Sequence, residues 1–219
     1  MSTDEKIGVK WIIQRGYSIE GQLAADGLSF EAFDLIEAST SATATEKIKG
    51  KIISRLAKNL RSDCQEDADA DISKIQYGVY CIALGTGFEI DYKKRNSRIV
   101  YIGSGSVYGR IKSHLKGKLF EFASALRSVP LRFYIADLTD VPNGKSVQRQ
   151  LEQALLKKFE DEIDNEFPLL NKRNAHARDL SVAFDKGWDL PLQRERGRGT
   201  TNWLLKAVDE DAWKGQLEK

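Results

Sequence analysis

The residue pattern changes near residue 77, from helical periodicity to segments rich in β-branched and aromatic side chains. Before this point, isoleucine and leucine recur at four-residue spacing, which predicts a helix over residues 46–60. After it, residues 77–84 have the composition of a strand, and residues 99–102 of a second, shorter strand. A helix followed by β-rich segments favours a mixed fold of helices and strands.

The middle of the chain continues this alternation. Apolar residues at four-residue spacing predict a helix over residues 107–115, and residues 120–126 suggest another before Pro130. Residues 131–138 alternate as a third strand, and Ser146 is a suitable N-cap for a long helix ending near residue 163. The order β-β-α-α-β-α predicts an α+β core, with a short antiparallel or mixed sheet and flanking helices.

The remaining segments have weaker patterns. A helix is expected over residues 28–38 with Ser29 as its N-cap, followed by a small polar linker over residues 39–45. Residues 85–97 are expected as a turn or long loop, and residues 203–208 as a short helix. The first residues of the chain indicate no clear state.

These patterns suggest three parts. An acidic stretch after Arg61 is expected to be a boundary. Residues 1–73 would form a helical extension that is a candidate recognition arm, and residues 74–176 the core. Residues 177–219 would be an irregular extension with candidate partner contacts.

Composition limits the chemistry. Cys64 and Cys81 are far apart and lack metal-ligand spacing, so a disulfide or zinc site is disfavoured. The chain has 2 histidines, which excludes a His-rich centre. Any metal would need oxygen ligands, as Mg²⁺ or Mn²⁺ does. Mean hydropathy is −0.44, without a long apolar run or a secretory leader pattern. We therefore expect a soluble, cytoplasmic protein with no membrane partner and no nucleotide cofactor.

Charge is nearly balanced overall but uneven locally. Lys and Arg total 34 against 32 Asp and Glu, for a formal charge of +2. Local basic clusters suit a phosphate-binding face, and ordinary solvated surface is the alternative. Solvation is also the simpler explanation of the basic faces of the helix at 46–60, with DNA-backbone contact as the alternative. The candidate nucleic-acid contacts are Lys112, Lys116, Lys172, Arg173, Arg194, Arg196 and Arg198.

Two tyrosine motifs lie on the first two expected core strands. Gly78-Val79-Tyr80 lies on one, and Tyr101-Ile102-Gly103 ends the other. If these strands form a hairpin, both phenols can reach one place. A phenol titrates near pH 10, and neighbouring cations could tune it toward a general base. Alternatively, both are ordinary strand aromatics.

Two further positions carry charge in suitable places. Arg110 and His114 are four residues apart and share a helical face near a glycine-containing helix start that would favour an anion. Read separately, they would be surface residues. Glu152 projects toward the apolar side of its helix, where a carboxylate is costly unless it is paired or binds a cation.

Over residues 77–174 the chain resembles the GIY-YIG nuclease family. The two tyrosine motifs are followed in family order by Arg110, His114, Glu152 and Asn171. The resemblance implies one divalent cation, Mg²⁺ or Mn²⁺, held by Glu152. It also implies that Tyr80, Tyr101 and Arg110 act on the attacking water and the scissile phosphate. His114 would support the nucleophile, and Asn171 would orient the phosphate or other site groups.

Three departures from the family are visible. The segment between the tyrosine motifs is long, and Ser104 stands where many members carry a basic residue, for which Lys112 is a substitute. The long stretch between Glu152 and Asn171 is acidic, which keeps Glu160 and Glu162 open as alternatives for the metal ligand.

The leading hypothesis is a restriction-type DNA endonuclease that uses its flanking segments for recognition. The alternatives are a strand- or structure-specific nicking nuclease of repair or mobile elements, and an inactive nucleic-acid-binding protein. A structural α+β domain with chance motif matches is a further alternative. An RNA substrate, a homodimer and the choice of general base between the two tyrosines stay open.

Overall fold

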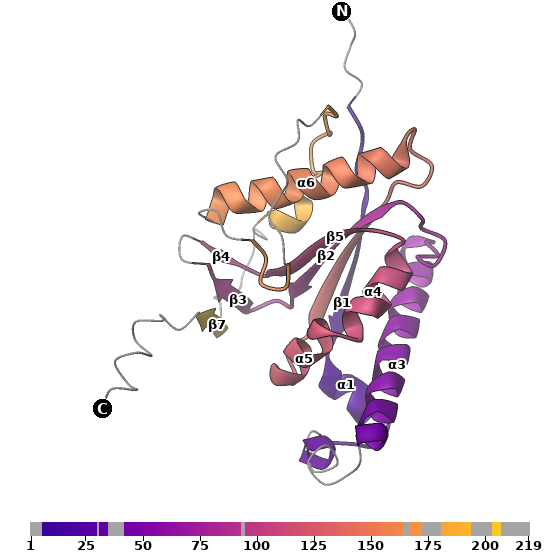
Figure 1. Ribbon diagram of the computed structural model, residues 1–219, viewed down its shortest axis with the longest axis vertical. Helices are drawn as coiled ribbons and strands as arrows, with labels where there is room; N and C mark the ends of the chain where they lie inside the picture. Colours follow the sequence, from indigo (N-terminus) through magenta and orange to yellow (C-terminus); the bar gives the residue numbers. More distant parts are fainter. Residues whose placement is uncertain are drawn as a thin grey trace, which may run out of the picture.

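The computed structural model describes residues 6–29, 31–34, 42–92, 95–163, 167–171, 181–193 and 203–206. These segments form an α+β fold around a four-stranded antiparallel sheet in the order β1-β6-β2-β5, with helices on both faces (Figure 1). None of the helices in these ranges is both long enough and apolar enough to cross a membrane.

Two inner and two outer strands make up the main sheet. The inner strands are β2 (Gly78–Leu84) and β6 (Leu131–Asp137), and the outer strands are β1 (Trp11–Tyr17) and β5 (Ile99–Gly105). Every residue of β2 is buried, as are all residues of β6 except its last. The alternation expected over residues 131–138 is therefore not seen in the burial of β6, because helices cover the sheet on both faces.

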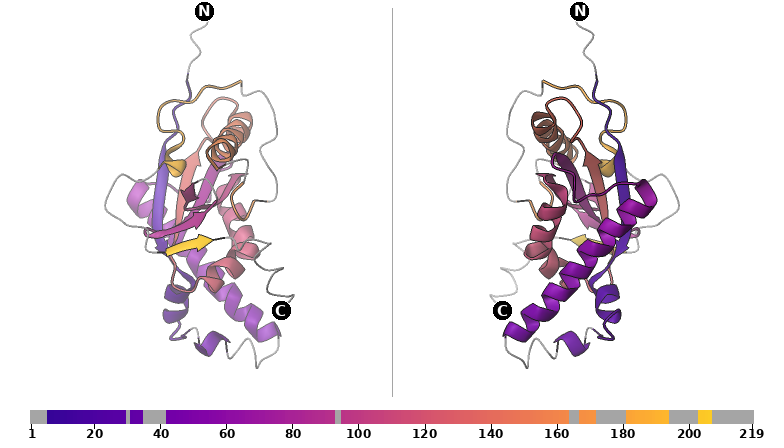
Figure 2. Two further views of the ribbon diagram at one scale, coloured as in Figure 1. Left: turned by 90° about the vertical axis from the view of Figure 1, so that its left-hand side faces the viewer. Right: turned by 90° about the vertical axis from the view of Figure 1, so that its right-hand side faces the viewer.

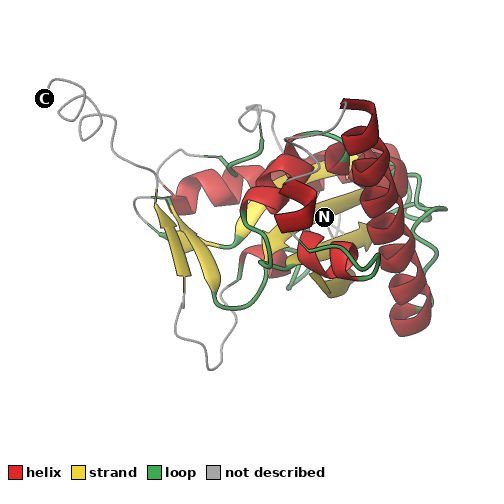
Figure 3. Cartoon of the chain, turned by 90° about the horizontal axis from the view of Figure 1, so that it is seen from below, coloured by secondary structure: helices red, strands yellow, loops and turns green. Residues whose placement is uncertain are grey.

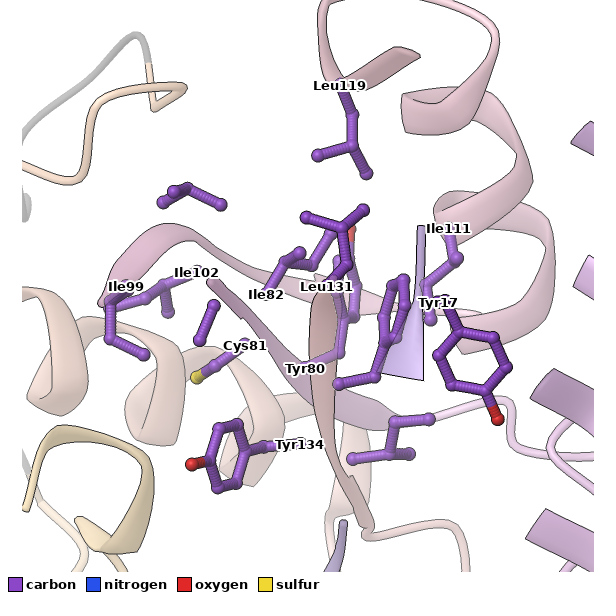
Figure 4. Packing of buried hydrophobic residues seen from close by; sticks show 14 of the residues in the cluster. Tyr17, Tyr80, Cys81, Ile82, Ile99, Ile102, Ile111, Leu119, Leu131 and Tyr134 are labelled. Carbon is purple, nitrogen blue, oxygen red and sulfur yellow. The ribbon is translucent and has the colours of Figure 1, made fainter. Parts of the chain in front are cut away.

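Helices α3 (Ala42–Ala68), α4 (Val107–Leu115) and α5 (Lys118–Ala125) lie on one face of this sheet, and α6 (Gly144–Ile163) lies on the other. Figure 4 shows Ile111 and Leu119 on one side of the strands. Cys81 and Tyr134 point to the other side. The long α3 runs diagonally beside β1 (Figure 2), and a short helix, α1 (Ile19–Ala24), follows β1 in the chain.

A smaller sheet lies apart from the main one (Figure 3). Its order is β4-β3-β7, with β3 (Phe88–Asp91) paired antiparallel to β4 (Asn96–Ser97) and parallel to β7 (Trp203–Lys206). The expected loop over residues 85–97 therefore contains two strands. The helix expected over residues 203–208 is wrong, because residues 203–206 pair with β3 instead.

Residues 181–193, which we call the C-terminal strap, pack against α6 and the start of β1. Trp11 Nε1 donates to the carbonyl oxygen of Trp188 at 3.0 Å. On α6, Lys158 binds Asp189. The strap contains a 3-10 turn, η1 (Leu190–Leu192). These contacts bring the C-terminal part of the chain onto the outer side of the helix that carries Glu152.

Several boundaries differ from those expected. Helix α3 covers residues 42–68, so it includes part of the expected linker and continues through the acidic stretch expected as a boundary. The acidic side chains are used in packing, since Tyr17 donates to Asp63 and Gln14 Nε2 donates to Asp67 at 3.2 Å. The segment expected as a helical extension over residues 1–73 therefore contains an edge strand of the sheet, β1.

Two helix starts test the capping predictions. Helix α6 begins at Gly144, so Ser146 lies inside it and is not its N-cap. Ser29 does accept a hydrogen bond from the backbone N–H of Ala32 at 3.2 Å, and residues 31–34 are helical. The rest of the helix expected over residues 28–38 lies outside the described residues.

Candidate active site

Tyr80 and Tyr101 meet on one face of the β2–β5 pair. Tyr80 lies opposite Gly103, and Tyr101 is two residues before that glycine on the same face. The two rings stack with their centroids 5.9 Å apart and an angle of 22° between their planes. The expected contact between the two motifs is thus observed. Tyr80 and Tyr101 are diagonal neighbours on adjacent antiparallel strands.

Gly103 makes this arrangement possible. A Cβ atom at this position would lie 2.6 Å from Cε1 of Tyr101 and 2.8 Å from the phenol oxygen of Tyr80. Both separations are shorter than ordinary van der Waals contact. Any residue larger than glycine would therefore displace one of the phenols.

Helix α4 brings His114 to the two tyrosines. Val107, Ile111 and Leu115 are buried on the sheet, which turns His114 toward the phenols. Its Nε2 atom lies 2.9 Å from the hydroxyl oxygen of Tyr80, and its ring centroid is 4.2 Å from that of Tyr101. If the proton of the neutral imidazole lies on Nδ1, the Tyr80 hydroxyl donates to Nε2.

Arg110 lies one turn before His114 on the same helix and is exposed. Its Cγ atom is 3.5 Å from the point that a Cβ atom would occupy on Gly105, at the end of β5. Its charge opposes the burial that raises the pKa of both tyrosines, and it adds to the burial that lowers the pKa of His114. Arg110 therefore places an exposed positive charge beside the tyrosine–histidine cluster.

Burial dominates the titration of the cluster. It raises the pKa of Tyr80 and of Tyr101, and this effect exceeds the opposing influence of Arg110. Burial also lowers the pKa of His114, with Arg110 acting in the same direction. Arg110 thus acts on the phenols in the direction expected from the sequence, but burial outweighs it, so the pKa of each phenol is raised. The group prepared to accept a proton at neutral pH is the neutral imidazole.

Glu152 approaches β5 from the opposite face. Its Oε2 atom accepts a hydrogen bond from the hydroxyl of Ser104 at 2.6 Å. By strand alternation Ser104 points to the α6 face, whereas Tyr101 points to the α4 face. Burial raises the pKa of Glu152, while the hydrogen bonds of Ser104 and the charges of Arg110 and Arg149 oppose that rise.

Charges on the two faces of β5 influence one another. The negative charge of Glu152 raises the pKa of both tyrosines, although it lies on the other side of the strand. Beyond β5 the main sheet has no further strand among the described residues. Glu152 and the tyrosine–histidine cluster therefore flank the same outer strand.

Asn171 holds this outer strand in place. Its Nδ2 atom donates to the carbonyl oxygen of Ile102 at 2.8 Å, and its Oδ1 atom accepts from the N–H of Ile102 at 3.0 Å. The neighbouring Leu170 N–H donates to the carbonyl oxygen of Val100 at 2.9 Å. Asn171 thus replaces a missing neighbouring strand at the center of β5, and its amide supports the backbone between Tyr101 and Gly103.

The alternatives for the acidic residue are less well placed. Glu162 binds Arg95 and lies 3.9 Å from Lys158. Glu152 contacts β5 directly, which favours it over Glu162. In the described ranges no group of three or more His, Cys, Asp or Glu side chains forms a metal cluster.

Some candidate residues are outside the cluster, and two contributing residues were not expected. Lys112 lies over the ring of Tyr108 at 5.4 Å, and Lys116 follows the last residue of α4. The roles of Ser104 and Arg149 beside Glu152 were not predicted, although Arg149 has the i, i+3 spacing that makes helix neighbours. The remaining candidate contacts lie outside the described residues: Lys172, Arg173, Arg194, Arg196 and Arg198.

Comparisons of the chain with models of protein families, with curated proteins and with solved structures found no match.

Proposed function

We propose that this protein is a divalent-cation-dependent DNA endonuclease of the GIY-YIG type. Its active site would lie at the end of β5, where it would hydrolyse a phosphodiester bond. The observation that carries the proposal is the gathering of the motif side chains at one strand. Tyr80, Tyr101 and His114 contact one another on one face of β5, and Glu152 is hydrogen-bonded to β5 on the other.

The tyrosine–histidine pair supplies a route for the proton of the attacking water. Tyr80 is protonated at neutral pH, and burial raises its pKa further above the ordinary value of 10, while burial lowers the pKa of His114 and favours its neutral form. As the water oxygen bonds to phosphorus, the water proton enters the tyrosine–histidine cluster, and the hydroxyl proton of Tyr80 passes to Nε2 of His114. The ester P–O bond then breaks, and solvent protonates the departing oxygen.

Arg110 is suited to bind the scissile phosphate. It is exposed at the end of β5 and its charge already acts on the cluster. A guanidinium group presents planar paired donors that match phosphate oxygens. It would therefore fix the phosphate next to Tyr80 and offset the charge that builds up on the oxygens during attack.

The donor set beside β5 fits a hard cation. Glu152 is a half-buried carboxylate whose pKa is raised by burial, which is the environment a bound cation would relieve. Mg²⁺ is commonly held by only one or two carboxylates, with waters and substrate phosphates completing its shell. When bound, the cation would neutralise phosphate charge and lower the pKa of a coordinated water. Ser104 keeps the Glu152 carboxylate oriented by its hydrogen bond.

Incubation with supercoiled plasmid DNA and Mg²⁺ tests the proposal. Nicked circles would indicate a single-strand nuclease, and discrete linear fragments would indicate a restriction-type enzyme. DNA that stays intact while being bound would contradict the nuclease proposal and favour a nucleic-acid-binding protein. A parallel reaction on single-stranded RNA would show whether DNA is the preferred substrate.

A further inference from the structure

A polar groove runs along the exposed side of the first half of α6. Its volume is about 420 Å³. Its charged lining residues are Lys145 and Arg149, and the other described residues that line it are asparagine, serine and glutamine. Among the described residues that line the groove there is no carboxylate, and neither cation forms an ion pair with a described residue. The described lining therefore offers positive charge and hydrogen-bonding groups.

The groove begins next to Glu152. Arg149 lies three residues before Glu152, so the two side chains are one turn and about 60° apart around the helix axis. The positive charge of Arg149 acts on Glu152 across this turn of the helix. Gln153, the residue after Glu152, also lines the groove. A phosphodiester backbone that extends from Glu152 along α6 would contact Arg149 first and Lys145 one helical turn further on.

Hydrogen bonds shape the wall of the groove. Gln150 Oε1 accepts from the N–H of Ser181 at 2.9 Å and from its hydroxyl at 3.2 Å, which ties the C-terminal strap to α6. In the first turn of α6, the N–H groups of Ser146 and Val147 are already bonded to the carbonyl oxygen of Asn143. These two amides are therefore already used, and the side chains of the groove remain to bind a ligand.

A second groove offers a useful contrast. It lies along α3 and contains Lys47, Lys51 and Arg55, but Asp26 is also part of its lining. Asp26 pairs with Arg55 and so neutralises one of the cations. This groove also lies on the face of the sheet opposite to α6. It is the poorer match for a polyanion that passes Glu152.

We propose that the groove at Lys145 and Arg149 binds the phosphodiester backbone of duplex DNA immediately beside the phosphate that Glu152 serves. This inference rests on the proposed endonuclease function, since it extends the same DNA-binding site along α6. The cations would bind phosphates without reading bases, so their contribution should not depend on DNA sequence.

Binding of the full-length protein to a fluorescent DNA duplex in EDTA tests the groove without cleavage. For wild type and a Lys145→Ala/Arg149→Ala variant, affinity is measured over a salt series on two unrelated sequences. Each lost phosphate contact should reduce the slope of log affinity against log salt by about 0.9, hence about 1.8 for both. A Lys10→Ala/Lys118→Ala variant, which removes two exposed lysines elsewhere, is the matched control and should keep the wild-type slope.

An unchanged slope in Lys145→Ala/Arg149→Ala protein of wild-type thermal stability would overturn the groove proposal. So would an equal loss in the control variant. The same proteins are then assayed on plasmid DNA with Mg²⁺. If the double variant lowers the salt slope but wild type does not cut DNA, the groove proposal stands and the nuclease function is rejected. If wild type cuts DNA but the double variant keeps the wild-type slope, the nuclease function stands and the groove proposal is rejected.

Discussion

The hydroxyl oxygen of Tyr80 on β2 lies 2.9 Å from Nε2 of His114 on α4. Neither group is suited to act by itself as the base for the attacking water. The phenol is protonated, and the imidazole contacts the phenol rather than the water. Together they form a donor and an acceptor whose titration is shifted in opposite directions. The contact also depends on Gly103, which leaves space for the phenol.

If Tyr80 and His114 act as one relay, their substitutions should not be additive. Tyr80→Phe and His114→Gln should each reduce the cleavage rate by about 100-fold, the scale of losing a general acid–base group. The double variant should cost little more than either single change. Single-turnover rates on a fixed DNA substrate measure this, and additive losses of activation free energy would show that the residues act separately.

The imidazole of His114 should titrate below its ordinary pKa of 6.5. NMR of a His176→Gln variant leaves one histidine signal to follow, since the chain has 2 histidines. Because the folded pKa is lowered, this group contributes stability that is present above pH 6.5 and lost as pH falls through the folded pKa. Adding Tyr80→Phe removes the phenol donor and should raise the pKa. A His114 pKa at or above 6.5 would contradict the buried, neutral imidazole.

Ser104 should act through Glu152. Ser104→Ala removes the hydroxyl that donates to Oε2 at 2.6 Å, so the concentration of Mg²⁺ that gives half-maximal cleavage should rise by about 10- to 100-fold. Ser104→Thr keeps a hydroxyl and suits a strand, so it should restore most of the Mg²⁺ response. Equal Mg²⁺ dependence in the alanine and wild-type proteins would remove Ser104 from the site.

Gly103→Ala should damage activity more than stability. The added methyl group would meet both phenols, and a displacement on the scale of 1 Å can reduce a rate by about 100-fold. Gly50→Ala is the control, because no atom lies within 4 Å of its Cβ position in α3. This exposed change should leave cleavage unaltered and stabilise the helix by up to about 1 kcal/mol. Full cleavage by folded Gly103→Ala protein would show that the phenol positions are not critical.

The core elements were predictable because their patterns are local. The period of the apolar residues identified α4 and most of α3, and β-branched segments identified β2, β5 and β6. The two tyrosine motifs also indicated correctly that the phenols would meet. Strand β1 was missed because an outer strand of mixed composition has no strong pattern of its own, and it is defined by pairing with β6 over a hundred residues later.

The remaining misses depend on tertiary contacts. The acidic stretch at the end of α3 looked like a boundary, but Asp63 and Asp67 bind side chains of β1. Strand β7 forms by pairing with β3 rather than by its own propensity. The sequence likewise does not show how deeply the two phenols are buried, and burial raises their pKa against the effect of the neighbouring cation. Ser104 was visible as a departure, but its hydrogen bond required the position of α6.

Glu152→Gln tests the central claim most directly, because it keeps the size of the side chain and removes its charge. Cleavage of plasmid DNA in Mg²⁺ is measured beside Glu160→Gln, a matched change on the same helix, with DNA binding in EDTA as a check on folding. The account predicts that Glu152→Gln abolishes cleavage while binding is kept, and that Glu160→Gln cuts normally. Near wild-type cutting by Glu152→Gln, or its loss in Glu160→Gln alone, would contradict the proposed role of Glu152.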